Sequence, residues 1–270
     1  MIAEEISGQF DLVREKCPLV HCITNYVTVN DVANAILAIG ASPIMADDIN
    51  EAADIASISS ALVINMGTLN QRTVASMLAA GKAANKKGIP VVFDPVGAGA
   101  SAFRNETAKA VMKNVRVDIL RGNLSEMSFM AGLEVSTKGV DSAAEDEKND
   151  AVSVAKTVAE KFGCIAAITG AVDTISDGGR GIRISNGHSA LSKVTGTGCM
   201  TSGIVGSFAG ASDDMLLAAA AGICAMGIAG EIAYEKAGKI GTGSFHIAII
   251  DALSRLDGAL AAERIRADEK

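Results

Sequence analysis

Short, continuously apolar runs alternate along the chain with longer stretches in which apolar residues recur every three or four positions. The short runs end in Asn, Gly, Asp or Pro and are typical of strands buried on both faces. Strands alternating with helices indicate a parallel sheet covered by helices, so we expect a layered α/β fold with a mainly parallel central sheet. The pattern predicts strands at 18–24, 43–46, 61–67, 89–95, 115–123 and 164–170, and helices at 29–40, 70–87 and 151–162.

The later part of the chain shows a different pattern. Two short runs at 173–178 and 181–185, joined by Gly-Gly-Arg, predict an added hairpin, and from Gly196 onward the pattern is helical to the end. The segment 141–150 is the most charged and predicts a solvated loop. Because no internal repeat, low-complexity tract or linker interrupts the pattern, we expect one domain over residues 1–270.

Composition makes the expected core aliphatic, because 49% of the 270 residues are hydrophobic while only 3% are aromatic and Trp is absent. The stretch 215–230 is uncharged and rich in Ala and Gly. It is shorter than the roughly 20 residues of a membrane-spanning helix, and acidic residues bracket it. We therefore predict a buried or subunit-contact helix and no membrane partner.

The net charge of −7 and the absence of any Lys/Arg-rich run argue against nucleic acid as a partner. The five cysteines are odd in number and include no C-x-x-C pair, which fits a reducing compartment rather than a disulfide framework or a zinc site. The N-terminus is acidic and has no apolar core of a signal peptide. We expect a cytoplasmic protein.

Polar or small residues end the predicted strands, and in parallel α/β sheets ligands bind outside these carboxyl ends. The candidates that this position selects are Asn25, Met45, Gly67, Asp94, Arg121 to Asn123, and Thr169.

The strongest local motif is VTGTGCMTSGIVGSF at 194–208, in which small residues directly precede an apolar helix. Backbone N–H groups of Gly196, Thr197 and Gly198 can turn inward at the positive helix end and form an anion site. Cys199 falls in the first helical turn, where a lowered thiol pKa would let it accept or orient the proton of an attacking hydroxyl. The alternatives are an ordinary Gly-rich helix start and a small buried cysteine.

Acidic residues follow two of the predicted strands. Asp94 is well placed to bind magnesium, or else to cap the turn that Pro95 forces. Asn123 and Glu126 have capping-box spacing, and the functional alternative places Glu126 beside Asp94 near magnesium and phosphates. Arg121 could contact nucleotide phosphates.

Other motifs point elsewhere or are absent. Gly97-x-Gly99-x-x-Ala102 follows a strand, with Asp118 further on, and matches a dinucleotide fingerprint, but Pro95 separates strand from glycines. There is no P-loop and no G-x-S-x-G elbow, and the three histidines are scattered.

A set of motifs in order along the chain resembles the hydroxyethylthiazole kinases of thiamin biosynthesis and salvage. The motifs are CITNYVTVNDVANAILAIGASPIMAD, LVINMGTL, PVVFDPVGAGAS, ILRGNLSEM, KGVDS, ITG and TGTGCMTSG. The resemblance runs from about residue 17 to the C-terminal helix. It implies a ribokinase-like fold and an alcohol phosphotransferase that phosphorylates 4-methyl-5-(2-hydroxyethyl)thiazole with ATP and Mg²⁺. It further implies homotrimers with active sites at subunit boundaries.

The resemblance also implies roles for individual residues. Cys199 takes the position of the catalytic base, where most of the superfamily has Asp, and Gly196, Thr197 and Gly198 match the anion hole. Asp94 and Glu126 match magnesium-side acids, and Asn123 opens the N-x-x-E motif. Arg121 and Thr169 match nucleotide-binding positions. Met45 and Gly196 match thiazole-binding positions, and Asn25 and Gly67 are expected to line that pocket.

Other functions are compatible with the same scaffold. A ribokinase-like kinase could act on another small alcohol, such as a hydroxymethylpyrimidine or a sugar. The scaffold could also serve an ATP-dependent hydrate dehydratase or a nucleotide-binding regulator without turnover. Thiazole-dependent turnover of ATP distinguishes these functions from the one that the resemblance implies.

Overall fold

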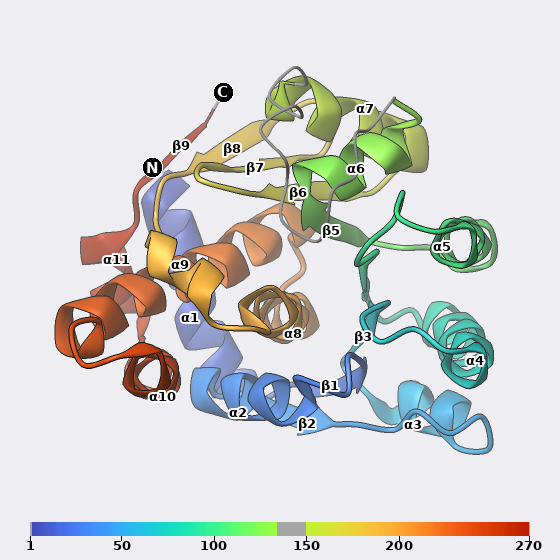
Figure 1. Ribbon diagram of the computed structural model, residues 1–270, viewed down its shortest axis with the longest axis horizontal. Coiled ribbons are helices and arrows are strands. Elements are labelled where there is room, and N and C mark those ends of the chain that lie inside the picture. The colour runs from blue at the N-terminus through green and yellow to red at the C-terminus, as the bar shows by residue number, and fades with distance from the viewer. Residues whose placement is uncertain (1, 134–149, 270) are drawn as a thin grey trace.

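The computed structural model describes residues 2–133 and 150–269, and in them nine strands form one sheet (Figure 1). The strand order is β2-β1-β3-β4-β5-β6-β7-β8-β9. Neighbours from β2 to β6 are parallel, and β6 to β9 are antiparallel, which confirms the mainly parallel sheet and the added hairpin. The strands are β1 (Leu19–Ile23), β2 (Ser42–Ile44), β3 (Ala61–Asn65), β4 (Val91–Asp94), β5 (Ile119–Asn123), β6 (Ile165–Thr169), β7 (Asp173–Ser176), β8 (Gly181–Ile184) and β9 (Ala267–Glu269).

Helices cover both faces of the sheet and bury one hydrophobic cluster on each (Figure 1). One face carries α1 (Ile2–Lys16), α2 (Val29–Ile39), α8 (Thr197–Ala211), α9 (Met215–Ala237), α10 (Thr242–Leu253) and α11 (Gly258–Arg264). The other carries α3 (Ala52–Ile58), α4 (Gln71–Lys87), α5 (Ala102–Asn114), α6 (Leu124–Ala131) and α7 (Ala151–Phe162). In β3, Val63 belongs to the first cluster, while Leu62 and Ile64 belong to the second. Because both faces are covered, the strand sequences are apolar throughout.

The α8 helix packs closely between the sheet and α9, because glycines occupy the positions where the helices and the sheet touch. A Cβ added at Gly203 would lie 2.9 Å from Val32 Cγ1, and one added at Gly206 would meet the side chain of Val63 in the sheet. On the other side, a Cβ added at Gly222 of α9 would lie 2.7 Å from the Cα of Val205. Glycine thus sets the distance between α8 and its neighbours.

The α9 helix contains the apolar stretch 215–230. In the part of the chain that the structure describes, it is the helix with the length and apolar composition to cross a membrane, but 78% of its most apolar window is buried inside the protein. It packs against α8 and α10. These contacts confirm the interpretation as a buried core helix.

Two sequence expectations about elements need correction. We expected helix to the end of the chain, but Ala267–Glu269 forms β9, which pairs antiparallel with β8 at the sheet edge. The three residues of β9 are small or acidic and contain no apolar run, which is the pattern that predicted the other strands. A strand at the exposed edge of the sheet buries little of its surface and does not require apolar residues. The helices α1, α3 and α5 were not predicted. Most of the charged loop expected at 141–150 lies outside the described residues, and Asp150 caps α7.

Candidate active site

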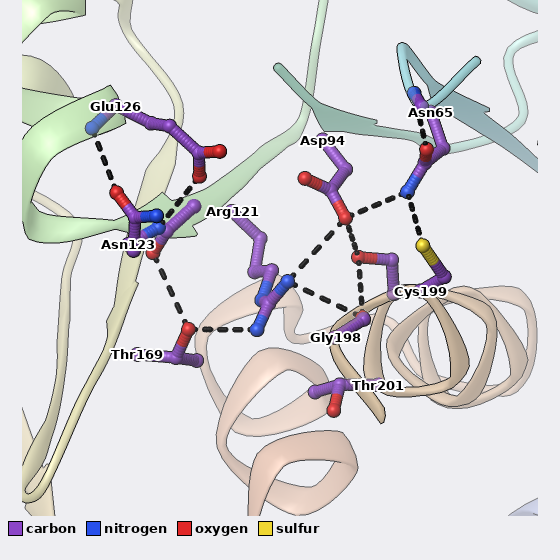
Figure 2. Close-up of polar contacts among 12 residues, drawn as sticks. Asn65, Asp94, Arg121, Asn123, Glu126, Thr169, Gly198, Cys199 and Thr201 are labelled. Atoms are coloured by element: carbon purple, nitrogen blue, oxygen red, sulfur yellow. Dashed lines mark hydrogen bonds and ion pairs between the residues drawn. The ribbon is translucent and has the colours of Figure 1, made fainter. Parts of the chain in front are cut away.

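Four neighbouring parallel strands, β3 to β6, bring their carboxyl ends together opposite the first turn of α8 (Figure 2). Asp94 ends β4, Arg121 lies in β5 and Thr169 ends β6. Figure 2 shows their side chains joined by polar contacts to one another and to α8. The sequence placed these residues at one edge of the sheet, and the structure confirms that they meet there.

Asp94 is the most connected acid of this site. Its Oδ2 accepts hydrogen bonds from Ser202 Oγ at 2.6 Å, Asn65 Nδ2 at 2.8 Å and Arg121 Nη1 at 3.3 Å. Burial raises the pKa of Asp94, and the adjacent Arg121 charge opposes this rise. Its other oxygen, Oδ1, is buried and has no hydrogen-bond partner within the described ranges 2–133 and 150–269. A buried oxygen without a partner marks a place for a ligand or ion.

Arg121 carries a buried positive charge that connects three elements. Besides Asp94, it donates from Nη1 to Gly198 O at 3.2 Å and from Nη2 to Thr169 Oγ1 at 2.7 Å. Its Nε is buried without a partner in the part of the chain that the structure describes. The guanidinium is therefore held beside the N-terminus of α8, with a donor still available.

The N-terminus of α8 has the geometry of an anion site. Gly196 is the N-cap with φ +88°, a left-handed conformation that disfavours any side chain, and an added Cβ would lie 2.5 Å from Thr28 Cγ2. No side chain caps the first turn, so its N–H groups point outward unsatisfied by a cap. The Thr197 hydroxyl bonds locally to Leu191 O at 3.3 Å, so Thr197 can serve an anion through its backbone.

Cys199 lies in this first turn, and its sulfur accepts contacts from Asn65 Nδ2 at 3.5 Å and Asn25 Nδ2 at 3.9 Å. We expected the helix end to lower the thiol pKa, and this expectation is wrong. Burial and the nearby Asp94 charge raise the pKa of Cys199, and the Thr28, Arg121 and Asn65 groups that lower it do not compensate. Burial and the Asp94 charge therefore favour the protonated thiol over the thiolate in the ligand-free protein.

Glu126 and Asn123 form the complete capping box that their spacing predicts. The Asn123 side chain accepts from Glu126 N at 2.8 Å, and Glu126 Oε2 accepts from Asn123 N at 2.9 Å. Glu126 Oε1 also accepts from Gly97 N at 2.8 Å, which ties the loop after β4 to α6. Burial, followed by the Asp94 charge, raises the pKa of Glu126 to about 7. The structural alternative is thus confirmed, and the Asp94 charge still acts on Glu126.

The donor set fits a magnesium ion that arrives with a nucleotide. No group of three or more His, Cys, Asp or Glu suited to a metal occurs in residues 2–133 and 150–269. Magnesium usually keeps several waters and binds through one or two carboxylates plus substrate phosphates. The unpaired Oδ1 of Asp94 offers such a ligand, whereas both oxygens of Glu126 already accept backbone N–H groups.

The residues expected on the substrate side are only partly brought together. Asn25 lies against Gly67, where an added Cβ would be 2.7 Å from the Asn25 side chain. The Asn25 amide contacts the Cys199 sulfur directly. Gly67 is linked to the sulfur through Asn65, which accepts from Gly67 N and donates to the sulfur. Met45 follows β2, packs against the hydrophobic cluster on the α8 face and makes none of the polar contacts described above. The adjoining Ala46 O is held by His21 Nε2 at 2.7 Å.

Three polar residues of this site were missed by the sequence analysis: Asn65, Thr28 and Ser202. Asn65 ends β3, but the predicted strand continued to Gly67, so Gly67 and not Asn65 was taken as the strand-end residue. Ser202 lies one helical turn after Cys199, a spacing that could have identified it.

The Gly97-x-Gly99 fingerprint does not form a phosphate-binding helix start. Both glycines have positive φ in a turn, and α5 begins only at Ala102, after its N-cap Ser101. Their N–H groups are already used, by Glu126 Oε1 and by Asn105 Oδ1 at 2.7 Å. The geometry therefore favours the anion site at Gly196 over a dinucleotide site.

Asp173, which begins β7 beside Thr169, gives a pH prediction. It is nine-tenths buried and accepts from Gly170 N at 2.9 Å, and burial raises its pKa from 3.8 to about 7. Between these values the folded protein retains a proton that the unfolded chain releases. Stability therefore falls as pH rises through this window, by up to about 1.4 kcal/mol per pH unit. Asp173→Asn is expected to remove this contribution.

Urea denaturation at several pH values inside the window measures the effect. The difference in unfolding free energy between wild type and variant should change with pH, even though Glu126 adds a slope of the same sign to both proteins. A constant difference would show that Asp173 is already ionised in the folded state.

Comparisons with known proteins show which family the chain is similar to. The model of the hydroxyethylthiazole kinase family matches residues 10–259. The hydroxyethylthiazole kinase of Ruminiclostridium cellulolyticum is 61% identical over 267 residues and covers 98% of each chain. The structure of the hydroxyethylthiazole kinase protein from Pyrococcus horikoshii OT3 has TM-score 0.89 and 38% identity, with 98% of each chain covered.

The fold recurs in a ribokinase-like superfamily protein of Enterococcus faecalis, with TM-score 0.64, 10% identity, and coverage of 92% of this chain and 95% of that one. At this identity the similarity concerns the fold alone, and it confirms the ribokinase-like architecture. Both the family model and the full-length relatives span the strand ends and the α8 turn described above. The chain belongs to the hydroxyethylthiazole kinase family.

Proposed function

We propose that this protein transfers the γ-phosphoryl group of ATP to the hydroxyl of 4-methyl-5-(2-hydroxyethyl)thiazole, as one domain. The observation that carries the proposal is the uncapped N-terminus of α8, which has the Arg121 guanidinium on one side and the Cys199 sulfur on the other. An anion site flanked by a fixed cation and a proton-accepting group is what phosphoryl transfer to an alcohol requires.

Each residue then has a role that follows from its position. Arg121 and Thr169 hold ATP phosphates, with Asn123 shaping the adjoining turn. The N–H groups that follow Gly196 stabilise the charge that develops on the transferring group. Cys199 orients the alcohol and, in its thiolate form, takes the alcohol's proton to become the thiol as the transfer proceeds, because phosphoryl transfer needs little early deprotonation of the nucleophile. Gly67, Asn25, Met45 and Gly196 line the thiazole side.

Magnesium would be held by Asp94, with Glu126 supporting the site from the first turn of α6. When bound, it neutralises charge on the phosphate oxygens. The contacts of Glu126 tie the loop after β4 to the start of α6. Asp94 itself is oriented by Ser202, Asn65 and Arg121.

We propose that the active form is a homotrimer with its sites at subunit boundaries. The residues after Asn25 support this, since Tyr26 and Val27 are 75% and 56% exposed at the rim of the site. Large apolar side chains exposed together typically mark an interface. A cytoplasmic location is supported by five free cysteines, four of which are buried thiols.

The test of the function is ADP release from Mg-ATP by the purified protein, with and without the hydroxyethylthiazole. Hydroxymethylpyrimidine is run as a parallel acceptor. Strong stimulation by the thiazole alone is expected. Turnover with the pyrimidine instead, or no stimulation by either alcohol, would overturn the proposed substrate.

The role of Asp94 gives a further prediction. Asp94→Ala is expected to raise the Mg²⁺ concentration needed for half-maximal activity by at least about tenfold, because it removes the buried ligand oxygen. Activity is measured at fixed ATP over a magnesium titration. Asp251→Ala is the control, since that carboxylate is half exposed and pairs with Lys236 on the surface. Normal activity of Asp94→Ala at limiting magnesium would contradict the assignment.

A further inference from the structure

Asn65, a residue without an assigned role, makes contacts with both chemical groups of the proposed site. It ends β3 and is completely buried. Its Nδ2 donates to Asp94 Oδ2 at 2.8 Å and to the Cys199 sulfur at 3.5 Å, and its Oδ1 accepts from Gly67 N at 2.8 Å (Figure 2).

The orientation of this amide is fixed by its partners. A backbone N–H can only donate, so the oxygen of Asn65 must face Gly67, and the NH₂ group must face the carboxylate and the sulfur. The NH₂ group has two hydrogens, and the two contacts use one each. The NH₂ group of Asn65 therefore has no donor left over, and a flipped amide would lose all three contacts.

These contacts define how the sulfur of Cys199 is presented. The sulfur accepts from Asn65 and, at 3.9 Å, from the amide of Asn25. Two amide donors favour the acceptor role of the sulfur and hold its position relative to Asp94. A group that must receive a proton from an alcohol needs this orientation before the alcohol binds.

On the basis of the proposed function, we infer that Asn65 is a positioning residue for phosphoryl transfer: its side-chain amide holds the Cys199 sulfur as an acceptor and in register with Asp94. Asn65 affects the reaction through the Cys199 sulfur, and its only contact with the proposed thiazole pocket is the hydrogen bond that it accepts from Gly67 N. Loss of Asn65 should therefore lower kcat while leaving KM for ATP within about threefold.

Ser202 provides the matched control because it shares one partner with Asn65 and lacks the other. Ser202 Oγ donates to the same Asp94 oxygen at 2.6 Å, but its other contact is to Gly198 O rather than to the sulfur. Ser202→Ala removes the hydrogen bonds to Asp94 and to Gly198 O, and none to the sulfur. Asn65→Leu removes the contacts to both Asp94 and Cys199, together with the acceptor for Gly67 N, with little change in side-chain size.

A double-mutant cycle on kcat separates the two routes. Asn65→Leu is expected to lower kcat about tenfold or more in the presence of Cys199 and by less than about threefold in a Cys199→Ala background. Ser202→Ala should lower kcat by the same factor in both backgrounds. Equal losses for Asn65→Leu in the two backgrounds would overturn the inference. If Asn65→Leu does not fold, Asn65→Asp retains the acceptor for Gly67 N–H. Its carboxyl shares any proton with Asp94 and so gives the sulfur no donor, and it should show the same non-additivity.

Iodoacetamide labelling of Cys199 gives a readout that does not need turnover. It is followed by mass spectrometry in a Cys17→Ser background, because Cys17 is the exposed cysteine. At one fixed, mildly alkaline pH, Asn65→Leu should slow labelling about threefold to tenfold, because an amide donor stabilises the thiolate. Unchanged or faster labelling would overturn the inference. Wild-type protein without thiazole-dependent ADP release would overturn the proposed function instead, while the labelling still reports the contact.

Discussion

Replacing Arg121 by methionine is expected to lower kcat/KM about 100- to 1,000-fold, the largest effect that the site predicts. The guanidinium is the buried cation beside the α8 N-terminus and contacts Asp94, Gly198 and Thr169. Its removal takes away charge stabilisation of the phosphates. It also leaves Asp94 buried without its cation, which typically costs about 3–5 kcal/mol of stability.

Steady-state kinetics and chemical denaturation measure the two effects of Arg121→Met separately. Arg121→Lys keeps the charge but cannot form the same forked contacts, so it should recover stability more than activity. Arg72→Met is the surface control, since Arg72 pairs with Asp47 in an exposed position and should cost about 0–1 kcal/mol. Near-wild-type kcat/KM for Arg121→Met would exclude Arg121 from the phosphate site.

Replacing Cys199 by alanine is expected to lower kcat about 100-fold or more, with KM for ATP little changed, because loss of a general base typically costs this much. The pH profile gives an independent signature. Burial and Asp94 raise the thiol pKa, so the wild-type kcat should rise with pH on the alkaline side of neutrality as thiolate forms. The alanine variant should lack this rise.

The kcat of both proteins, measured across the alkaline range at saturating substrates, checks this prediction. Cys224→Ala is the control for loss of a thiol, since Cys224 is buried in α9 and makes none of the polar contacts of the site described above. A loss well below tenfold, with the alkaline rise intact, would show that Cys199 only packs or positions the alcohol.

The strand–helix alternation, the parallel sheet and the strand-end position of Asp94, Arg121 and Thr169 could be predicted from sequence because they depend on local periodicity. The edge strand β9 could not, because Ala267–Glu269 obtains its conformation from β8 and not from its own apolar content. Apolar periodicity reveals helices and strands only where their side chains are buried, and an exposed edge strand buries few of its side chains.

The candidate site was predictable in its residues but not in its electrostatics. The position of Cys199 at a helix N-terminus suggested a lowered pKa, which is a local effect of the helix. The rise comes from the burial of Cys199 and from the charge of Asp94, which is 105 positions earlier in the chain. Asn65 was missed for the same reason, since its importance lies in partners that only the sheet order and the α8 contact bring together.

The glycine contacts of α8 have a consequence for how this enzyme can change. The helix that presents Gly196 to Cys199 is spaced from α2 by Gly203, from the sheet by Gly206 and from α9 by Gly222. Adding a methyl group at any of these positions would displace the reactive turn relative to Asp94 and Arg121 without touching a substrate. Thermostability and turnover are thus constrained by the same packing, and stabilising substitutions should be sought on the outer surfaces of α4 and α7.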